Sequence, residues 1–262
     1  MKYGFIGCGN MGGAIARAVS QATKDIMISD RSGRAKALAG ELGIHYGDNQ
    51  TIARTCDRIF LAVKPHMMAD MLSPLRETLQ IRKPLLITMA AGLTLDRIDQ
   101  LAGGNLPVIR IMPNTPAMIG KGLTQYCRNG LVTDGVLDSF LHDMRFSGEL
   151  DCLDEQLIDA ASALSGCGPA YMYMFLEALS DGAVACGIPR AKAIRYAAAT
   201  MAGAAEMVLA TQQHPGALKD AVCSPGGSTI AGVRALERSG FRGAAMDCVI
   251  AAYEKNKQMG NQ

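Results

Sequence analysis

The sequence predicts an α/β domain with a doubly wound parallel sheet over residues 1–153, followed by an all-α domain over residues 154–262. Short apolar runs alternate with helix-length segments in the first part of the chain, as is typical of a parallel sheet with crossover helices. A glycine-rich turn joins the first apolar run to the first helical segment. No strand pattern follows residue 153, and the remaining segments are helical in character.

The glycine-rich turn has the spacing G-x-G-x-x-G, formed by Gly7, Gly9 and Gly12. It follows an apolar run at residues 3–6 and precedes a helical segment at residues 11–19. In this setting the first glycine permits a tight turn, the second lets backbone approach a pyrophosphate, and the third lets helix and strand pack closely. The N–H groups at the helix N-terminus favour phosphate. The turn therefore predicts a Rossmann-like dinucleotide-binding domain, with a purely structural turn as the alternative.

The second predicted strand, at residues 25–29, ends at Asp30, Arg31 and Ser32. Dinucleotide-binding folds read the adenosine ribose at this distance from the glycine turn. An acid here accepts a hydrogen bond from the ribose 2′-hydroxyl and favours NAD, whereas Arg or Ser suits a 2′-phosphate and favours NADP. Because both kinds of residue are present, the sequence leaves the cofactor open. A solvated turn with Ser32 as a helix N-cap is the simpler alternative.

The other elements of the first domain follow in alternation. Apolar runs predict strands at residues 44–46, 58–63, 84–90, 106–112, 123–127 and 148–153. Helices are predicted at residues 32–42, 66–79, 95–101 and 134–144, with a further helical turn from Asp48 and Asn49. Gly43 is a stop signal for the helix at 32–42, and Thr94 is a candidate N-cap for the helix at 95–101.

Two groups of residues follow strands of the predicted parallel sheet, where open α/β sheets bind ligands. Lys64 follows the strand at 58–63, so its ammonium can face a phosphate or a ribose, or solvent alone. Ala90, Ala91 and Gly92 end the next strand. These small residues leave room for a flat ring to approach the backbone.

The second domain contains six predicted helices, at residues 157–164, 170–186, 190–210, 215–222, 229–239 and 244–259. Such an apolar helical domain often buries its surface against a second copy, so we expect at least a dimer. Residues 223–229 join two of the helices and read Cys-Ser-Pro-Gly-Gly-Ser-Thr. Backbone N–H groups at a helix start of this kind can hold a carboxylate. A simple N-cap by Ser224 or Ser228 is the alternative.

Composition excludes several other classes of protein. The net charge of +2 gives no indication of binding to nucleic acid or to an acidic membrane surface. No apolar stretch reaches the ~18 residues of a membrane span, and the N-terminal segment lacks the pattern of a signal peptide. The eight cysteines are scattered and include no C-x-x-C pair. We therefore expect reduced thiols in a cytoplasmic protein, without disulfides or a metal site.

Several segments, in order along almost the whole chain, resemble the Δ1-pyrroline-5-carboxylate reductases. They are residues 4–12, 62–65, 112–116, 164–171 and 214–229. The last segment contains Leu-Lys-Asp and Ser-Pro-Gly-Gly and is specific to that family, whereas the first is shared with many dehydrogenases. The resemblance implies reduction of L-1-pyrroline-5-carboxylate to L-proline, the last step of proline biosynthesis, by NADPH or alternatively by NADH. It also implies a homodimer built by the helical domains, which in some relatives assembles into a homodecamer.

The resemblance also implies the roles of individual residues. The pyrophosphate is held by Ile6, Gly7, Cys8, Gly9, Asn10 and Met11. The adenosine end is held by Asp30, Arg31, Ser32 and Asn49, and further cofactor contacts come from Ala62, Val63, Lys64, Pro65 and Asn114. The nicotinamide lies by Ala90, Ala91 and Gly92. The substrate carboxylate is held by Ser224, Gly226, Gly227, Ser228 and Thr229, with Thr229 also bonding the ring nitrogen as the catalytic residue. Cys167 and Gln212 depart from the family pattern, which usually has Ser and often has an acid there.

The expected catalysis is mainly positioning, because a protonated imine forms to some extent in solution and needs no strong protein acid. A β-hydroxyacid dehydrogenase is the alternative enzyme, but Lys192 and Lys219 lack the Gly-x-x-x-Lys context of that family's catalytic lysine. A non-catalytic nucleotide-binding protein is a further alternative. Such a protein has no use for a carboxylate site at residues 224–229.

Overall fold

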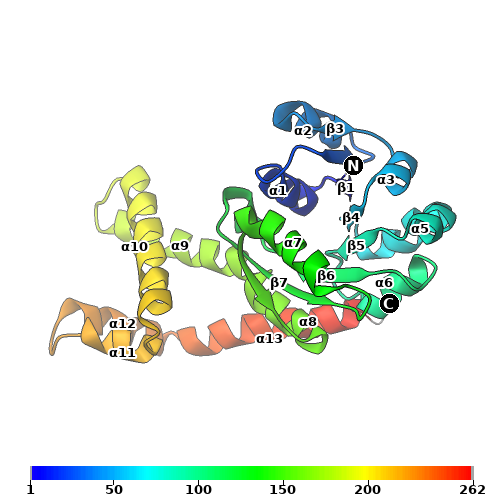
Figure 1. Cartoon of the computed structure of the whole chain (residues 1–262). Helices are drawn as coiled ribbons and strands as arrows, with labels where there is room; N and C mark the ends of the chain where they lie inside the picture. Colours follow the sequence, from blue (N-terminus) through cyan, green and yellow to red (C-terminus); the bar gives the residue numbers. More distant parts are fainter. Residues whose placement is uncertain (1, 261–262) are drawn as a thin grey trace. The chain divides into compact units, whose positions relative to one another are not determined.

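A computed structural model describes residues 2–260, which form two compact units (Figure 1). The first unit runs to Cys167 and includes the C-terminal residues from Ala252 onward. The second unit is Gly168–Ala251. The domain boundary predicted at residue 153 falls earlier, before helix α8 (Glu155–Ser165). This helix packs within the first unit, since its Ile158 is buried in the core beneath the sheet.

The described part of the first unit contains an eight-stranded sheet in the order β3-β2-β1-β4-β5-β6-β7-β8. The strands are β1 (Tyr3–Ile6), β2 (Ile26–Ser29), β3 (His45–Tyr46), β4 (Arg58–Leu61), β5 (Leu85–Thr88), β6 (Val108–Met112), β7 (Gly122–Arg128) and β8 (Gly148–Cys152). From β1, the strands β2 and β3 are added on one side and β4 to β8 on the other, so the direction in which the sheet is built reverses beside β1. This places the glycine turn at the point where open α/β sheets bind ligands. The doubly wound fold predicted from the sequence is confirmed.

One pair of strands departs from the predicted parallel sheet. β7 runs antiparallel to β6, whereas all other neighbouring strands are parallel within the described residues. Only residues 113–121 separate these two strands. A parallel connection needs a crossover of about a dozen residues or more, so this shorter link turns the chain back on itself. The expectation of an entirely parallel sheet was therefore wrong at β7.

The helices of the first unit match the predicted segments, with one exception. They are α1 (Asn10–Val19), α2 (Arg34–Leu42), α3 (Asn49–Thr55), α4 (Met68–Leu72), α5 (Arg76–Arg82), α6 (Leu95–Leu101), α7 (Asp134–Met144) and α8. The Thr94 side chain caps α6 by accepting from Arg97 N at 3.2 Å, as predicted. The single helix predicted at residues 66–79 is instead broken into 3-10 turns and two α-helices. Pro74 lies at the break, where its ring and missing N–H disfavour a continuous helix.

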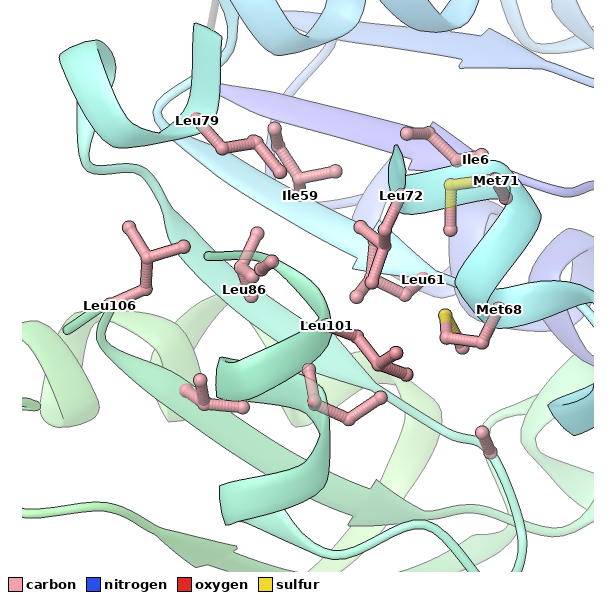
Figure 2. Packing of buried hydrophobic residues seen from close by; sticks show 14 of the residues in the cluster. Ile6, Ile59, Leu61, Met68, Met71, Leu72, Leu79, Leu86, Leu101 and Leu106 are labelled. Carbon is pink, nitrogen blue, oxygen red and sulfur yellow. The ribbon is translucent and has the colours of Figure 1, made fainter. Parts of the chain in front are cut away.

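Two hydrophobic clusters cover the two faces of the sheet. On β1, Tyr3 and Phe5 pack in the cluster that includes α1, α2 and α7. The next residue, Ile6, points to the other face and packs with α3, α4, α5 and α6. Figure 2 shows this second cluster, with Met71 of α4 close to Ile6. This alternation of side chains between the two faces is the normal period of a β-strand. Both faces of the sheet are therefore packed against helices.

The second unit is helical and presents many apolar side chains on its surface. Its helices are α9 (Gly168–Ala185), α10 (Arg190–Thr211), α11 (Pro215–Ala221), α12 (Ser228–Arg238) and the part of α13 (Phe241–Gly260) before Ala252. Met174 is 71% exposed and Leu209 is 68% exposed. Within residues 2–260, no helix combines the length and apolar character that crossing a membrane requires.

Candidate dinucleotide cavity and substrate loop

The turn after β1 brings glycine backbone against the residue that follows β4 and against the start of α1. Gly7 has a φ of 101°, and its N–H donates to Ser29 O at 2.9 Å. A Cβ on Gly7 would lie 2.6 Å from Ala62 O, and a Cβ on Gly12 would overlap Gly7 O. Any other side chain at these two positions would collide with backbone atoms.

The surroundings of Gly9 differ from those of Gly7 and Gly12. It is the N-cap of α1, and no side chain caps this helix. A Cβ at Gly9 would meet no atom within 4 Å, so the backbone here is open to a ligand. Because a helix N-terminus with uncapped N–H groups favours negative charge, this part of the turn fits a pyrophosphate.

A cavity of about 1260 Å³ lies beside the turn, at the carboxyl ends of β1, β2, β4 and β5. This is the edge of the sheet at which the sequence predicted a cofactor. The predicted cofactor residues that line it are Ile6, Gly7, Gly9, Asn10, Met11, Asp30, Arg31, Ser32, Asn49, Ala62, Val63, Lys64, Pro65, Ala90 and Ala91. Residues that are far apart in the sequence thus come together around one space.

The corner of the cavity after β2 contains two side-chain pairs. Ser29 Oγ donates to Asn49 Oδ1 at 2.6 Å, which leaves the amide nitrogen of Asn49 as the donor of that group. Ser32 Oγ donates to Asp30 Oδ2 at 2.8 Å. The other carboxylate oxygen, Asp30 Oδ1, is buried and has no hydrogen-bond partner. Ser32 is not the N-cap of α2, because that position is taken by Gly33 without a side-chain bond.

Basic side chains outnumber acidic ones around the cavity. Its cationic residues are Arg31, Arg34, Arg54 and Lys64, and its acidic residues are Asp30 and Asp48. Asp48 is the N-cap of α3 and accepts from Thr51 N at 2.7 Å. That backbone hydrogen bond is the main reason why the pKa of Asp48 lies below its usual value. A positive balance of charge suits a ligand that carries phosphate groups.

Three predicted cofactor residues do not line the cavity. Cys8 is buried, and burial, followed by the negative charge of Asp30, raises the pKa of its thiol to about 12. Gly92 has a φ of 75° and lies in the turn after β5. Asn114 is buried, and both ends of its amide are engaged: Oδ1 accepts from Leu123 N at 3.0 Å and Nδ2 donates to Ser165 O at 3.1 Å. The cofactor roles of these three residues stay predictions.

Sequence reasoning missed part of the cavity wall. The unassigned residues that line it are Gly12, Ser29, Arg34, Tyr46, Gly47, Asp48, Gln50, Arg54, Met67, Met71 and Met89. Arg34 could have been predicted from the sequence, because it is a cation at the first position of α2, just after the predicted ribose-binding residues. Met71 could not have been predicted, because its spacing is that of a core residue of α4, and it is only 5% exposed.

The predicted substrate loop lies in the second unit, between α11 and α12. Gly226 has a φ of 71°, and Gly227 N donates to Ser224 O at 3.0 Å, which closes a tight turn. Gly227 is the N-cap of α12 and no side chain caps the helix. Neither Ser224 nor Ser228 is therefore a simple cap. Thr229 is exposed in the second position of α12, beside these uncapped N–H groups.

The loop of residues 223–229 contains no acidic residue and no histidine. The histidine of the second unit, His214, is already engaged at the start of α11, where Nδ1 accepts from Gly216 N at 3.0 Å. The described residues also contain no cluster of three or more His, Cys, Asp or Glu that could hold a metal ion. The loop thus offers backbone N–H groups and hydroxyls.

Two family models match the chain. Residues 155–259 match the model described as pyrroline-5-carboxylate reductase dimerisation. Residues 2–92 match the model described as NADP oxidoreductase, coenzyme F420-dependent. The first match contains the predicted substrate loop, and the second contains the glycine turn and all the residues that line the cavity.

Full-length relatives carry the same name. The chain is 40% identical over 264 residues to the pyrroline-5-carboxylate reductase of Escherichia coli strain K12, covering 98% of both chains. It superposes on the enzyme of Streptococcus pyogenes with a TM-score of 0.90 and 34% identity, covering 98% of both chains. The enzyme of Plasmodium falciparum, solved with NADP bound, gives a TM-score of 0.89 and 33% identity, covering 99% of this chain and 98% of that one.

Proposed function

The chain belongs to the pyrroline-5-carboxylate reductase family, and we propose that it reduces L-1-pyrroline-5-carboxylate to L-proline with NADPH, the last step of proline biosynthesis. The observation that carries this proposal is the likeness over the full length of both chains, from the glycine turn to the substrate loop. This likeness displaces both alternatives considered from the sequence, a β-hydroxyacid dehydrogenase and a non-catalytic nucleotide-binding protein.

The cavity of the first unit fits a dinucleotide. The backbone at Gly9 is open, and the wall contains four cationic side chains and two acidic ones. In the proposal, the start of α1 holds the pyrophosphate, and Asn49 with the corner after β2 holds the adenosine end. Ala90 and Ala91 leave room for the nicotinamide, which supplies the hydride when it is bound.

The substrate loop supplies the other contacts. We assign the carboxylate of the substrate to the uncapped N–H groups at the start of α12, since a helix N-terminus stabilises an anion without a basic side chain. The hydroxyl of Thr229 then hydrogen-bonds the ring nitrogen and orients the C=N bond. One hydride adds to the imine carbon and one proton, from solvent, completes the amine. No residue of the chain has to act as a strong acid.

The proposed assembly is a homodimer formed through the helical unit. Support comes from the match to a dimerisation family over residues 155–259 and from the exposed apolar side chains of α9 and α10. Burial of such side chains against a second copy removes apolar surface from water. A homodecamer and a cytoplasmic location remain predictions.

The proposal is tested with the purified full-length protein, by following the absorbance of NADPH with and without L-1-pyrroline-5-carboxylate. We expect oxidation only when the imine is present, with formation of an equal amount of L-proline. Oxidation of NADPH with a β-oxoacid in place of the imine, or no oxidation by protein that binds NADPH, would contradict the proposal. The same assay with NADH measures whether the enzyme accepts both dinucleotides.

A further inference from the structure

We propose that Asn114 and Asn256 are positioning residues for imine reduction: they attach the two points at which the chain passes between the units to one helix, α8, without touching the dinucleotide. The chain leaves the first unit after Cys167 and returns to it at Ala252; we call these points the first and second crossings. The proposed dinucleotide cavity belongs to the first unit and the proposed substrate loop to the second. The geometry of both crossings therefore matters for hydride transfer. The inference rests on the proposed function for the reaction that it concerns.

The first crossing follows directly on the C-terminus of α8. The last carbonyl groups of a helix have no partner within that helix. Here the carbonyl of Ser165, the last residue of α8, accepts from Asn114 Nδ2 at 3.1 Å. The hydroxyl of Ser165 lies 3.0 Å from both Gln125 Oε1 and Ala161 O. Asn114 follows β6 and Gln125 lies on β7, and both are buried. The last turn of α8 is thus attached to two neighbouring strands.

The second crossing lies within α13 and is attached to the same helix. Asn256 Nδ2 donates to Asp159 O of α8 at 3.1 Å, and the end of α13 lies beside α8 (Figure 1). Asn256 comes four residues after Ala252, about one helical turn into the first unit. Among residues 252–258 it is the one buried residue. A buried amide needs a hydrogen-bond partner, so this segment of α13 is fixed in place by a polar contact with α8.

A buried arginine attaches α8 to the sheet. Arg110 of β6 is 1% exposed, and its Nη2 lies 2.6 Å from Asp159 Oδ1. Its Nη1 lies 3.5 Å from Glu155 Oε1, one turn earlier on α8. A buried guanidinium is stable only when it is paired, so the two carboxylates keep this face of α8 against β6. Asp159 binds Arg110 through its side chain and Asn256 through its backbone. The second crossing is therefore connected to the sheet through a single residue.

The contacts of Asn114 favour a positioning role over a direct role in dinucleotide binding. Asn114 is not among the residues that line the cavity. Its Oδ1 accepts from Leu123 N at 3.0 Å, and its Nδ2 donates to Ser165 O, so both ends of the amide are used within the first unit. A displacement of about 1 Å caused far from the reacting atoms can lower turnover about 100-fold. Loss of the contact with α8 should therefore impair hydride transfer while the cavity stays intact.

The test compares Asn114→Asp with a matched control, Asn129→Asp, in the full-length protein. Asn114→Asp keeps the accepting oxygen of the side chain but replaces the donor to α8 by a second oxygen. Asn129→Asp makes the same change in an amide that is used in the same way. Its Oδ1 accepts from Val108 N at 3.1 Å and its Nδ2 donates to Leu106 O at 2.8 Å. These contacts are at the start of β6, so the control removes a similar hydrogen bond without touching either crossing.

We expect Asn114→Asp to lower kcat/KM for the imine about 10- to 100-fold. The dissociation constant of NADPH, measured by isothermal titration calorimetry without imine, should stay within about two-fold of the unchanged protein. Asn129→Asp should stay within about three-fold in both quantities. Asn256→Leu removes the donor at the second crossing and should change kcat/KM in the same direction as Asn114→Asp. Thermal midpoints show that each variant is folded at the temperature of the assay.

Unchanged kcat/KM in Asn114→Asp, or an equal loss in Asn129→Asp, would overturn the proposal. A parallel loss of NADPH affinity in Asn114→Asp would also overturn it, because it would indicate a direct contact with the dinucleotide. If Asn114→Asp does not fold, Asn256→Leu decides, and unchanged kcat/KM there would overturn the proposal. Unchanged protein that does not oxidise NADPH with the imine would overturn the proposed function and this inference with it, whereas the other outcomes leave the proposed function intact.

Discussion

The hydroxyl of Thr229 is the one side-chain contact proposed for the imine nitrogen. Thr229→Ala should lower kcat by roughly 10- to 1000-fold, the range seen when one positioned polar contact to the reacting group is lost. Thr229→Ser keeps a hydroxyl at the start of α12 and should stay within a few-fold of the unchanged enzyme. Steady-state kinetics with varied imine measures both. Full activity of Thr229→Ala would show that the hydroxyl does not orient the nitrogen.

At the same scale, Asp143 links stability to pH. Its Oδ2 lies 2.7 Å from Lys2 Nζ and accepts from Tyr3 OH at 2.8 Å. Burial raises the pKa of this carboxyl, but the hydrogen bonds and the charge of Lys2 outweigh burial and hold the pKa below its ordinary value. A lowered pKa means that the stabilisation is complete above the unfolded value, ~3.9, and is lost as pH falls through the folded value.

Asp143→Asn should therefore lower the free energy of unfolding by about 1–3 kcal/mol at neutral pH, the cost of unpaired buried partners. It should also flatten the fall of the thermal midpoint as the pH is lowered from ~5 toward ~3. Glu41→Gln is the control, since it breaks an exposed pair with Arg17 and should change stability little. Equal acid sensitivity in Asp143→Asn and the unchanged protein would show that Asp143 does not cause the loss of stability at low pH.

At the scale of one element, two glycines of the same turn are expected to serve different purposes: Gly9 in dinucleotide binding and Gly12 in the stability of the fold. Gly9→Ala places a methyl group in open space, so the fold should persist while the methyl obstructs the pyrophosphate. We expect NADPH affinity to fall at least about ten-fold with little change in the thermal midpoint. Gly12→Ala drives its methyl into Gly7 O and the Ala62 side chain, so it should cost about 1–3 kcal/mol of stability through overpacking. Thermal unfolding and dinucleotide titration of both variants distinguish these effects.

The opposite result for Gly9→Ala, with unchanged affinity and a lowered midpoint, would mean that Gly9 serves the fold alone.

Most elements could be predicted because their signals are local. An apolar run and a cap are read within a few residues, as the match of Thr94 and α6 illustrates. The direction of β7 depends on a second strand and on the short link at residues 113–121, so a pattern read strand by strand missed it. Pro74 marked the broken helix, but the apolar spacing around it still suggested one continuous helix.

The residues of the cavity, too, could be predicted only where the signal is local in the sequence. Residues that follow β1, β2 and β4 could be predicted, since the carboxyl ends of parallel strands meet at one edge. The roles of Asn114 and Met71 could not. The amide of Asn114 is used by Leu123 and Ser165, a pairing visible only once β6, β7 and α8 are folded together. Met71 reaches the cavity from a helix whose pattern is that of the core.

At the scale of the whole molecule, the proposed dimer depends on apolar side chains of the helical unit. Leu209→Glu should raise the dimer dissociation constant at least about ten-fold, because it places a charge where apolar surface is expected to be buried. Ile81→Glu is the control, since Ile81 is 76% exposed but lies on α5 of the first unit. Sedimentation velocity over a range of concentrations measures both. A dimer that Leu209→Glu leaves intact while Ile81→Glu dissociates it would place the interface on the first unit.

The central claim is that a hydride passes from the nicotinamide to the imine carbon of L-1-pyrroline-5-carboxylate. The most direct test supplies the enzyme with NADPH deuterated at the transferable position of C4 and analyses the proline by mass spectrometry. The account predicts proline with a single deuterium, on the carbon that was double-bonded to nitrogen. Proline without deuterium, or consumption of NADPH without proline, would contradict it.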